Sequence, residues 1–303
     1  MKNQPIVVLG FGRSGTTWIA DIISKSLGKL ILFEPIHPSV TDIAEELAYS
    51  SISDNITNKL ISLYNNIFNQ NHRKMWLLRN HVPDRLENIS GDFLELLWNK
   101  CEIGGIKEIR ANFLIDWYLK NMDAKIVFII RHPCATVSSI KGRPNFWEFG
   151  WPRTYEIFLQ KTIFSQTYKN HPIQNNINLI KSVKSYEEKI AIMWAITHAI
   201  SLPKMKELNL PVIIYENLYD DPFNVSRELL TYLGYPQAPI HPSYLFTPSM
   251  TTLKTIHGIK DLEERKKKKG WSFFWEERLT DNDVKAIMHI VNEFGIDIFN
   301  EYI

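Results

Sequence analysis

Residues 10–18, with the sequence GFGRSGTTW, form the stretch of the chain best suited to bind an anion. An apolar run at residues 6–9 stands directly before it, and a strand, a glycine-rich loop and a helix in that order cradle phosphate groups. Two glycines and Thr17 match the pattern G-x-x-x-x-G-K-[ST], but Thr16 replaces its lysine and the nearest cation is Arg13. Such a loop suits a nucleotide with a single 5′ anionic group and a bridging leaving oxygen, rather than a triphosphate with Mg²⁺. A corner of strand, turn and helix without a ligand is the alternative interpretation.

The hexapeptide RSGTTW resembles the 5′-phosphosulfate loop, [KR]-S-G-[TS]-T-[WFL], of the sulfotransferases that use 3′-phosphoadenosine 5′-phosphosulfate (PAPS). The resemblance implies that PAPS is the cofactor and adenosine 3′,5′-bisphosphate the product. It implies that Arg13 contacts the 5′-phosphosulfate and that Trp18 packs on the adenine. The residues that would supply N–H and hydroxyl donors to the same group are Ser14, Gly15, Thr16 and Thr17.

Three further segments resemble parts of the same family. RHPCATVSS supplies Arg131 at the end of an apolar run and Ser139 eight residues later, which is the family's 3′-phosphate site. YENLYDDPFNVSRELLTYLG begins with Tyr215, which by the resemblance reaches the adenine. ERKKKKGW resembles the short basic stretch that closes over the 3′-phosphate, although a run of lysines is more often a solvated surface. The residues implied in that stretch are Lys268, Lys269 and Gly270.

Sulfuryl transfer also needs a general base, because the acceptor hydroxyl or amine loses a proton. Glu34, in LILFEPIHPS, stands where tyrosylprotein, carbohydrate and bacterial members carry a glutamate, and it is the favoured base. His37, in the same segment, orients Glu34 or replaces it. His81, in LLRNHVP, resembles the histidine of the K-T-H-x-P box of aryl and steroid sulfotransferases, but it precedes the 3′-phosphate arginine by more residues than that box does. At the spacing of that box the chain instead has Arg110 and Asn112.

The acceptor side of the site is expected in an insertion at about residues 142–180, which is rich in aromatic residues. These are Phe146, Trp147, Phe149, Trp151 and Tyr155. They can line a pocket for a planar or apolar acceptor, or they can form the insertion's own small core. We expect a small-molecule acceptor, with a secondary metabolite such as a polar alkaloid or a glycolipid as the example.

The elements that must position these residues alternate between strands and helices. That alternation predicts an α/β fold of the P-loop-like, three-layer type, with a central parallel sheet flanked by helices, in a single domain over residues 1–303. A capping box at Thr280 and Asp283 predicts a C-terminal helix that ends before Gly295. The expected strands are at residues 6–10, 30–33, 126–130 and 212–215, with weaker candidates at 75–78 and 106–109.

Composition limits the remaining alternatives. A net charge of +2 over 303 residues is too small to favour a nucleic-acid partner. Two cysteines, Cys101 and Cys134, make no disulfide framework, and no Cys/His spacing fits zinc, so we expect no metal and a reducing compartment. The sequence reaches its first strand within a few residues, so we expect no signal peptide, no membrane partner and a cytoplasmic protein. A homodimer is one arrangement that the sequence leaves open.

Two other functions are alternatives to a sulfotransferase. A P-loop small-molecule kinase would share the sheet and the loop, but it would carry a lysine at position 16 and an aspartate for Mg²⁺ after a strand. A non-catalytic nucleotide-binding protein would keep the cofactor residues and lose the base. The presence of Glu34, His37 and His81 favours an enzyme.

Overall fold

The computed structural model describes residues 4–69, 75–78, 81, 91–141, 154–246 and 275–299. Within these ranges a five-stranded sheet has the order β2–β3–β1–β4–β5, and every pair of neighbouring strands is parallel. The strands are β1 (Ile6–Gly10), β2 (Leu30–Phe33), β3 (Ile103–Glu108), β4 (Lys125–Ile130) and β5 (Val212–Ile214). The expected α/β class with a central parallel sheet is confirmed.

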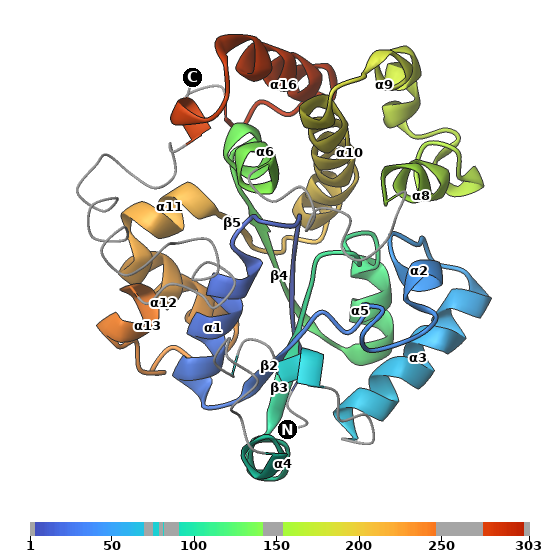
Figure 1. Ribbon diagram of the computed structural model, residues 1–303. Helices are drawn as coiled ribbons and strands as arrows, with labels where there is room; N and C mark the ends of the chain where they lie inside the picture. The colour runs from blue at the N-terminus through green and yellow to red at the C-terminus, as the bar shows by residue number, and fades with distance from the viewer. Residues whose placement is uncertain are drawn as a thin grey trace.

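Helices cover both faces of the sheet, so the structure has three layers (Figure 1). Along β4, Ile126, Phe128 and Ile130 belong to the core on one face, whereas Val127 and Ile129 belong to the core on the other. Burial on both faces explains why the sequence KIVFII shows no polar alternation. The helices on the second face include α1 (Thr16–Leu27) and α12 (Pro222–Tyr232), and those on the first include α3 (Asp54–Phe68) and α5 (Ile115–Met122).

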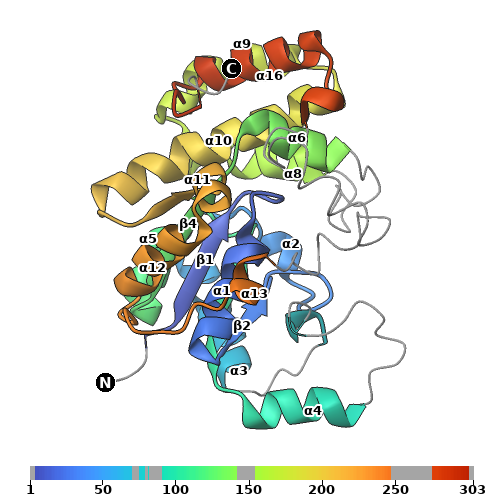
Figure 2. The ribbon, with the colours of Figure 1, turned by 90° about the vertical axis from the view of Figure 1, so that its left-hand side faces the viewer.

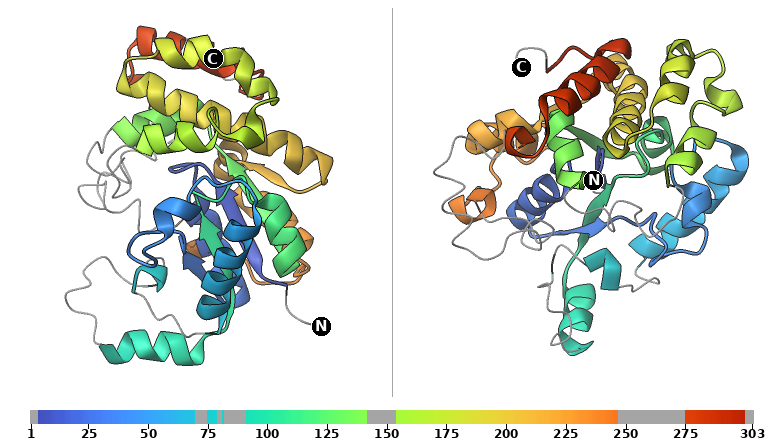
Figure 3. Two further views of the ribbon diagram at one scale, coloured as in Figure 1. Left: turned by 90° about the vertical axis from the view of Figure 1, so that its right-hand side faces the viewer. Right: turned by 45° about the horizontal axis from the view of Figure 1, so that its top comes forward.

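A group of helices packs above the carboxyl ends of the strands. These helices are α6 (Pro133–Lys141), α10 (Tyr186–Glu207) and α16 (Asp281–Glu293), which contact one another there (Figures 1 and 3). The helix α16 begins with the expected capping box: the N–H of Asp283 donates to Thr280 Oγ1 at 3.2 Å, and the N–H of Thr280 donates to Asp283 Oδ2 at 2.9 Å. The other helices are α2 (Ala44–Leu47), α4 (Gly91–Lys100), α8 (Thr154–Lys161), α9 (Ile177–Ser182), α11 (Tyr215–Asp220) and α13 (Pro242–Phe246), with short 3₁₀ helices η1 (Met75–Leu78), η3 (Gln166–Tyr168) and η4 (Pro172–Asn176).

Two of the strand predictions need correction. The run at 75–78 is the 3₁₀ helix η1, which packs against the edge strand β2 and buries Leu77 and Leu78 completely. The strand expected at 106–109 is β3, and it begins three residues earlier, at Ile103. Glycine is present at the start of β3 because this part of the strand lies very close to β1. A Cβ atom on Gly105 would lie 2.0 Å from the carbonyl oxygen of Ile6. Glycine in a strand therefore marks an approach of two backbones here rather than the end of the strand.

The connections between the strands indicate that a ligand site lies at the carboxyl ends of β1 and β4. From β1 the chain runs through α1 to β2 on one side, and from β4 it runs through α6 and α10 to β5 on the other. Parallel α/β sheets bind their ligands at the carboxyl ends of two neighbouring strands whose connections diverge in this way. Figure 2 shows α6 and α10 lying across this end of the sheet. Among the helices of the described ranges, none is both long and apolar enough to span a membrane.

Candidate active site

The loop between β1 and α1 turns through two residues with left-handed backbone conformations. Arg13 has a φ of 69° and Gly15 a φ of 93°. Gly15 is the N-cap of α1, and no side chain caps this helix end, so the N–H groups of its first turn are available to an anion. A Cβ atom on Gly15 would lie 2.5 Å from Cδ2 of Tyr215. The site therefore requires glycine for two reasons, the φ angle and the contact with Tyr215.

The structure brings the two arginine motifs together at the carboxyl ends of β1 and β4. Arg13 Nε donates a hydrogen bond to Ser139 Oγ at 3.1 Å, although the two residues are 126 positions apart. Arg131 Nη1 donates to the backbone oxygen of Arg13 at 3.2 Å. Arg13, Arg131 and Ser139 are each half-buried. We refer to these three residues together with Trp18 and Tyr215 as the arginine cluster.

Aromatic rings form one side of the arginine cluster. The guanidinium carbon of Arg131 lies 4.4 Å from the ring centre of Tyr215, a distance at which a cation is attracted to the ring face. The Trp18 and Tyr215 rings meet edge to face, with centres 5.6 Å apart. Trp18 Nε1 also donates to the backbone oxygen of Leu245 at 3.1 Å. These contacts fix a partly exposed, edge-to-face aromatic pair beside the arginine side chains.

Buried polar atoms in the loop and in Arg131 fit a phosphate group. Among the described residues, Ser14 Oγ and Arg131 Nε are buried and have no hydrogen-bond partner. Buried donors without partners are uncommon in native proteins, and a bound oxyanion would accept hydrogen bonds from both. Thr16 and Thr17 are buried in the first turn of α1. The predicted residues Lys268, Lys269 and Gly270 lie outside the described residues.

Glu216 is a neighbour of the cluster that the sequence analysis missed. Its Oε1 accepts the backbone N–H of His132 at 3.1 Å, which fixes the turn that leads from Arg131 into α6. Burial raises the pKa of Glu216, and the positive charge of Arg131 opposes that rise. The only signal in the sequence was its position directly after Tyr215.

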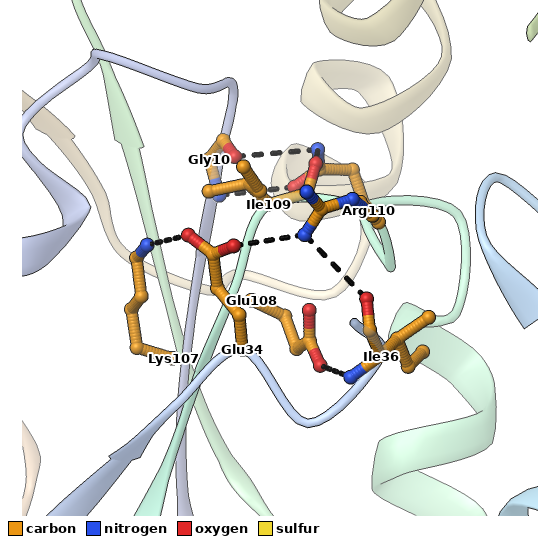
Figure 4. Close-up of polar contacts among 8 residues, drawn as sticks. Gly10, Glu34, Ile36, Lys107, Glu108, Ile109 and Arg110 are labelled. Carbon is orange, nitrogen blue, oxygen red and sulfur yellow. Dashed lines mark hydrogen bonds and ion pairs between the residues drawn. The ribbon is translucent and has the colours of Figure 1, made fainter. Parts of the chain in front are cut away.

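Glu34 lies at the carboxyl end of β2 in a buried ion-pair network (Figure 4). Its Oε1 contacts Lys107 Nζ, and its Oε2 accepts a hydrogen bond from Arg110 Nη1 at 2.8 Å. Only 5% of Glu34 is exposed, and its backbone has a φ of 43°, which is unusual for a non-glycine residue. Burial raises the pKa of Glu34, but Lys107 and Arg110 outweigh burial and lower the pKa to about 2. The carboxylate therefore stays ionised at neutral pH.

A second buried carboxyl group lies in the same network and behaves in the opposite way. Glu108 is fully buried, and its Oε1 accepts the N–H of Ile36. Burial raises the pKa of Glu108 to about 8, and the charge of Glu34 adds to the effect. Besides Glu34, the charged residues of this network lie in the segment KEIR, residues 107–110. Charges at the end of a buried strand were the signal that could have identified Lys107.

The two histidines have contacts of different kinds. His37 Nδ1 accepts the N–H of Ser39 at 3.0 Å, and its ring stacks on Trp76 with centres 3.7 Å apart. His81 Nε2 lies 3.1 Å from the backbone oxygen of Ile31, in the edge strand β2. Burial lowers the pKa of His81, the hydrogen bond opposes this, and Lys25 adds to the decrease. Because Ile31 is near the start of β2 and Lys25 is in the last turn of α1, His81 lies away from the carboxyl end of the sheet.

Comparison with known proteins gives structural neighbours alone. No protein-family model and no curated protein matches the chain. The sulfotransferase domain of the Synechococcus PCC 7002 olefin synthase is 14% identical, with 97% of this chain and 95% of that chain covered and a TM-score of 0.43. Sulfotransferase STF9 from Mycobacterium avium is 16% identical, with 99% and 76% covered and a TM-score of 0.41. The sulfotransferase domain from the curacin biosynthetic pathway is 13% identical, with 96% and 97% covered and a TM-score of 0.44. In all three comparisons the aligned residues cover at least 96% of this chain.

Proposed function

We propose that the protein is a sulfotransferase that uses PAPS and modifies a hydroxyl or amine group of a small molecule. The observation that carries this proposal is the contact between the two motifs: Arg13 Nε donates to Ser139 Oγ at 3.1 Å, and Arg131 Nη1 donates to the backbone oxygen of Arg13 at 3.2 Å. Two cations and a hydroxyl group are thus held together where the connections after β1 and β4 run in opposite directions. This arrangement suits a nucleotide with two separate anionic groups.

The loop residues and each member of the arginine cluster have a role in this proposal. The loop donors Ser14, Gly15, Thr16 and Thr17 hold the 5′ anionic group, and Arg13 places a positive charge against it. Arg131 and Ser139 hold the 3′-phosphate. Trp18 and Tyr215 contact the adenine. Lys268, Lys269 and Gly270 are proposed to complete the 3′-phosphate site. When bound, PAPS supplies an activated sulfuryl group for transfer to the acceptor.

For the proton of the acceptor we propose Glu34 as the base. Glu34 lies at the same edge of the sheet as the loop, two strands from β1, which corresponds to about 10 Å in the plane of the sheet. Its pKa of about 2 makes it a weak base while Lys107 and Arg110 both hold it. Displacement of either cation by the acceptor would raise the pKa of Glu34, because one of the two groups that lower it would be lost. His37, three residues further on, is the alternative base at this edge, and His81 is the less favoured one.

The acceptor class belongs to the proposal as well. We propose a small secondary metabolite, such as a polar alkaloid or a glycolipid, and a cytoplasmic enzyme that can form a homodimer. Of the aromatic residues named for the insertion, Tyr155 lies in α8, and Phe146, Trp147, Phe149 and Trp151 lie outside the described residues. Tyr155 is partly buried against the main core, which supports a packing role for this ring.

Calorimetric titration with adenosine 3′,5′-bisphosphate tests the proposal against the kinase alternative. We expect the wild type to bind the bisphosphate in preference to ATP with Mg²⁺, and Arg131→Ala to lose about 100-fold in affinity, since two charge-assisted contacts are removed. Arg227→Ala is the matched control. Arg227 also donates to backbone oxygens and lies over an aromatic ring, but it belongs to α12 and not to the arginine cluster. Preference for ATP with Mg²⁺ would replace the sulfotransferase with a kinase. Tight bisphosphate binding without transfer to any acceptor would favour a non-catalytic nucleotide-binding protein.

A further inference from the structure

Gly10 is the residue at which β1 ends and the anion-binding loop begins. On one side it is paired with Ile129 of β4, but on the other side the pairing with β3 ends one residue earlier, at Leu9 and Glu108. The N–H and C=O groups of one strand residue point to the same side of the strand. Gly10 therefore needs a donor and an acceptor from another part of the chain on its β3 side.

The side chain of Asn112 supplies both groups. Its Oδ1 accepts the N–H of Gly10 at 2.9 Å, and its Nδ2 donates to the C=O of Gly10 at 3.3 Å and to the C=O of Ile109 at 3.0 Å. Figure 4 shows the two bonds to Gly10 above the Glu34 network. A side-chain amide carries the same acceptor and donor as a peptide group, so Asn112 extends the sheet by one residue.

Asn112 is itself held rigidly. It is 3% exposed, and its backbone oxygen accepts a hydrogen bond from Ser201 Oγ of α10 at 3.1 Å. The backbone of Gly10 also packs closely against β4, because a Cβ atom added to Gly10 would lie 2.5 Å from the carbonyl oxygen of Ile129. Gly10 is thus fixed on both sides, and the orientation of its carbonyl group sets the peptide plane from which the loop starts.

We propose that Asn112 is a positioning residue that directs the N–H groups at the start of α1, those of Gly15, Thr16 and Thr17, toward a bound phosphate group. The inference rests on the proposed function, because it takes this loop as the anion site. Asn112 does not touch the ligand; it acts through Gly10. The affinity for adenosine 3′,5′-bisphosphate is then expected to depend on both the donor and the acceptor of the Asn112 side chain.

Asn112→Ala removes both groups, and we expect its bisphosphate affinity to fall at least 10-fold in calorimetric titration. Asn121→Ala is the matched control, since the Asn121 side chain also donates to a backbone oxygen, that of Trp117 at 3.0 Å, but within α5. If Asn112→Ala does not fold, Ser201→Ala serves in its place, because it frees the backbone of Asn112 and leaves the side chain intact. For Ser201→Ala we expect a smaller loss, of about 3-fold.

Asn112→Asp separates positioning from a merely structural role. An ionised aspartate accepts the N–H of Gly10 but repels the carbonyl oxygens of Gly10 and Ile109, whereas a protonated one donates to one of them. The affinity of this variant relative to wild type is therefore expected to recover as the pH falls from 8.5 to 6. The neighbouring charged groups Glu34, Glu108, Lys107 and Arg110 are the same in both proteins, so the ratio of the two affinities reports on position 112.

The outcomes distinguish the inference from the proposed function. Wild-type protein that does not bind the bisphosphate overturns the proposed function and, with it, the inference. Wild-type protein that binds, together with folded Asn112 variants of unchanged affinity, overturns the positioning role alone. Loss of affinity in Asn112→Ala, pH-dependent recovery in Asn112→Asp and unchanged binding in Asn121→Ala support the inference.

Discussion

Arg110 Nη1 donates to Glu34 Oε2 at 2.8 Å, and both side chains are buried. Glu108, which comes two residues before Arg110 in the chain, lies in the same network but has the N–H of Ile36 as its hydrogen-bond donor. Two carboxyl groups in one network therefore have pKa values displaced in opposite directions, to about 2 for Glu34 and to about 8 for Glu108. The difference arises because cations pair directly with one and burial dominates the other.

Glu34→Gln is expected to lower both stability and turnover. At pH 7 the substitution leaves Lys107 and Arg110 buried without their anion, and we expect a loss of roughly 3 kcal/mol in the free energy of unfolding. The folded-state pKa of about 2 lies below the unfolded value of 4.5, so the stabilisation is complete above pH 4.5 and is lost as the pH falls toward 2. The stabilities of wild type and Glu34→Gln are therefore expected to approach each other as the pH falls. Urea denaturation of both proteins at pH 7, 4 and 3 measures this difference in the free energy of unfolding.

The catalytic part of that prediction concerns the folded fraction of Glu34→Gln. If Glu34 is the base, turnover falls about 100-fold or more while the affinity for the bisphosphate stays close to that of the wild type. Unchanged turnover would remove Glu34 as the base and leave His37 as the candidate at this edge, with His37→Ala as the next measurement.

Glu108→Gln is expected to stabilise the protein, and increasingly so at higher pH. The folded state holds the proton of Glu108 more tightly than the unfolded chain does, so ionisation costs stability as the pH rises from 4.5 to about 8. The amide oxygen of glutamine still accepts the N–H of Ile36. We expect a gain of up to about 3 kcal/mol near pH 8 and none below pH 4.5, measured by denaturation across this range. A constant difference at all pH values would contradict the predicted titration.

Gly15→Ala is expected to abolish anion binding in a protein that still folds. The new Cβ atom would lie 2.5 Å from Cδ2 of Tyr215 at a φ of 93°, so the loop or Tyr215 must shift, at a cost of roughly 1–3 kcal/mol. Gly28→Ala, at the other end of α1, is the control, because Gly28 also has a positive φ, of 63°, but its Cβ atom would meet nothing within 4 Å. Equal bisphosphate affinity in the two variants would show that the contact with Tyr215 is irrelevant to the site.

Ser139→Ala tests the link between the two motifs. Removal of the hydroxyl group frees Arg13 Nε, and we expect the affinity for adenosine 3′,5′-bisphosphate to fall about 10-fold. The affinity for adenosine 5′-monophosphate should fall less, since the 3′-phosphate that Ser139 is proposed to hold is missing. Ser182→Ala, in α9, removes a hydroxyl group that donates to the backbone oxygen of Leu179 in the same helix, and it serves as the control. An equal loss for both nucleotides would place Ser139 outside the 3′ site.

Much of the fold could be predicted from local patterns in the sequence. The runs at 6–10, 30–33, 126–130 and 212–215 correspond to strands within one residue at either end, because each is apolar and each is bounded by turn residues or helix starts. The prediction of a strand at 75–78 was wrong, because four apolar residues fit a buried 3₁₀ turn as well as a strand. Gly104 and Gly105 concealed the start of β3, because glycine is more often the end of a strand than part of one.

The residue types at the candidate site and their order along the chain can be read from the sequence alone. RSGTTW and the spacing from Arg131 to Ser139 are local features, and local features are what a sequence displays. The three-dimensional fold is needed to see that Arg13 bonds to Ser139, that Asn112 holds Gly10, and that Lys107 and Arg110 both pair with Glu34. These partners are between 73 and 126 positions apart and meet because parallel strands bring their carboxyl ends to one edge of the sheet. The pKa of Glu34 was therefore beyond any sequence pattern, because it depends on burial and on cations that the fold places beside it.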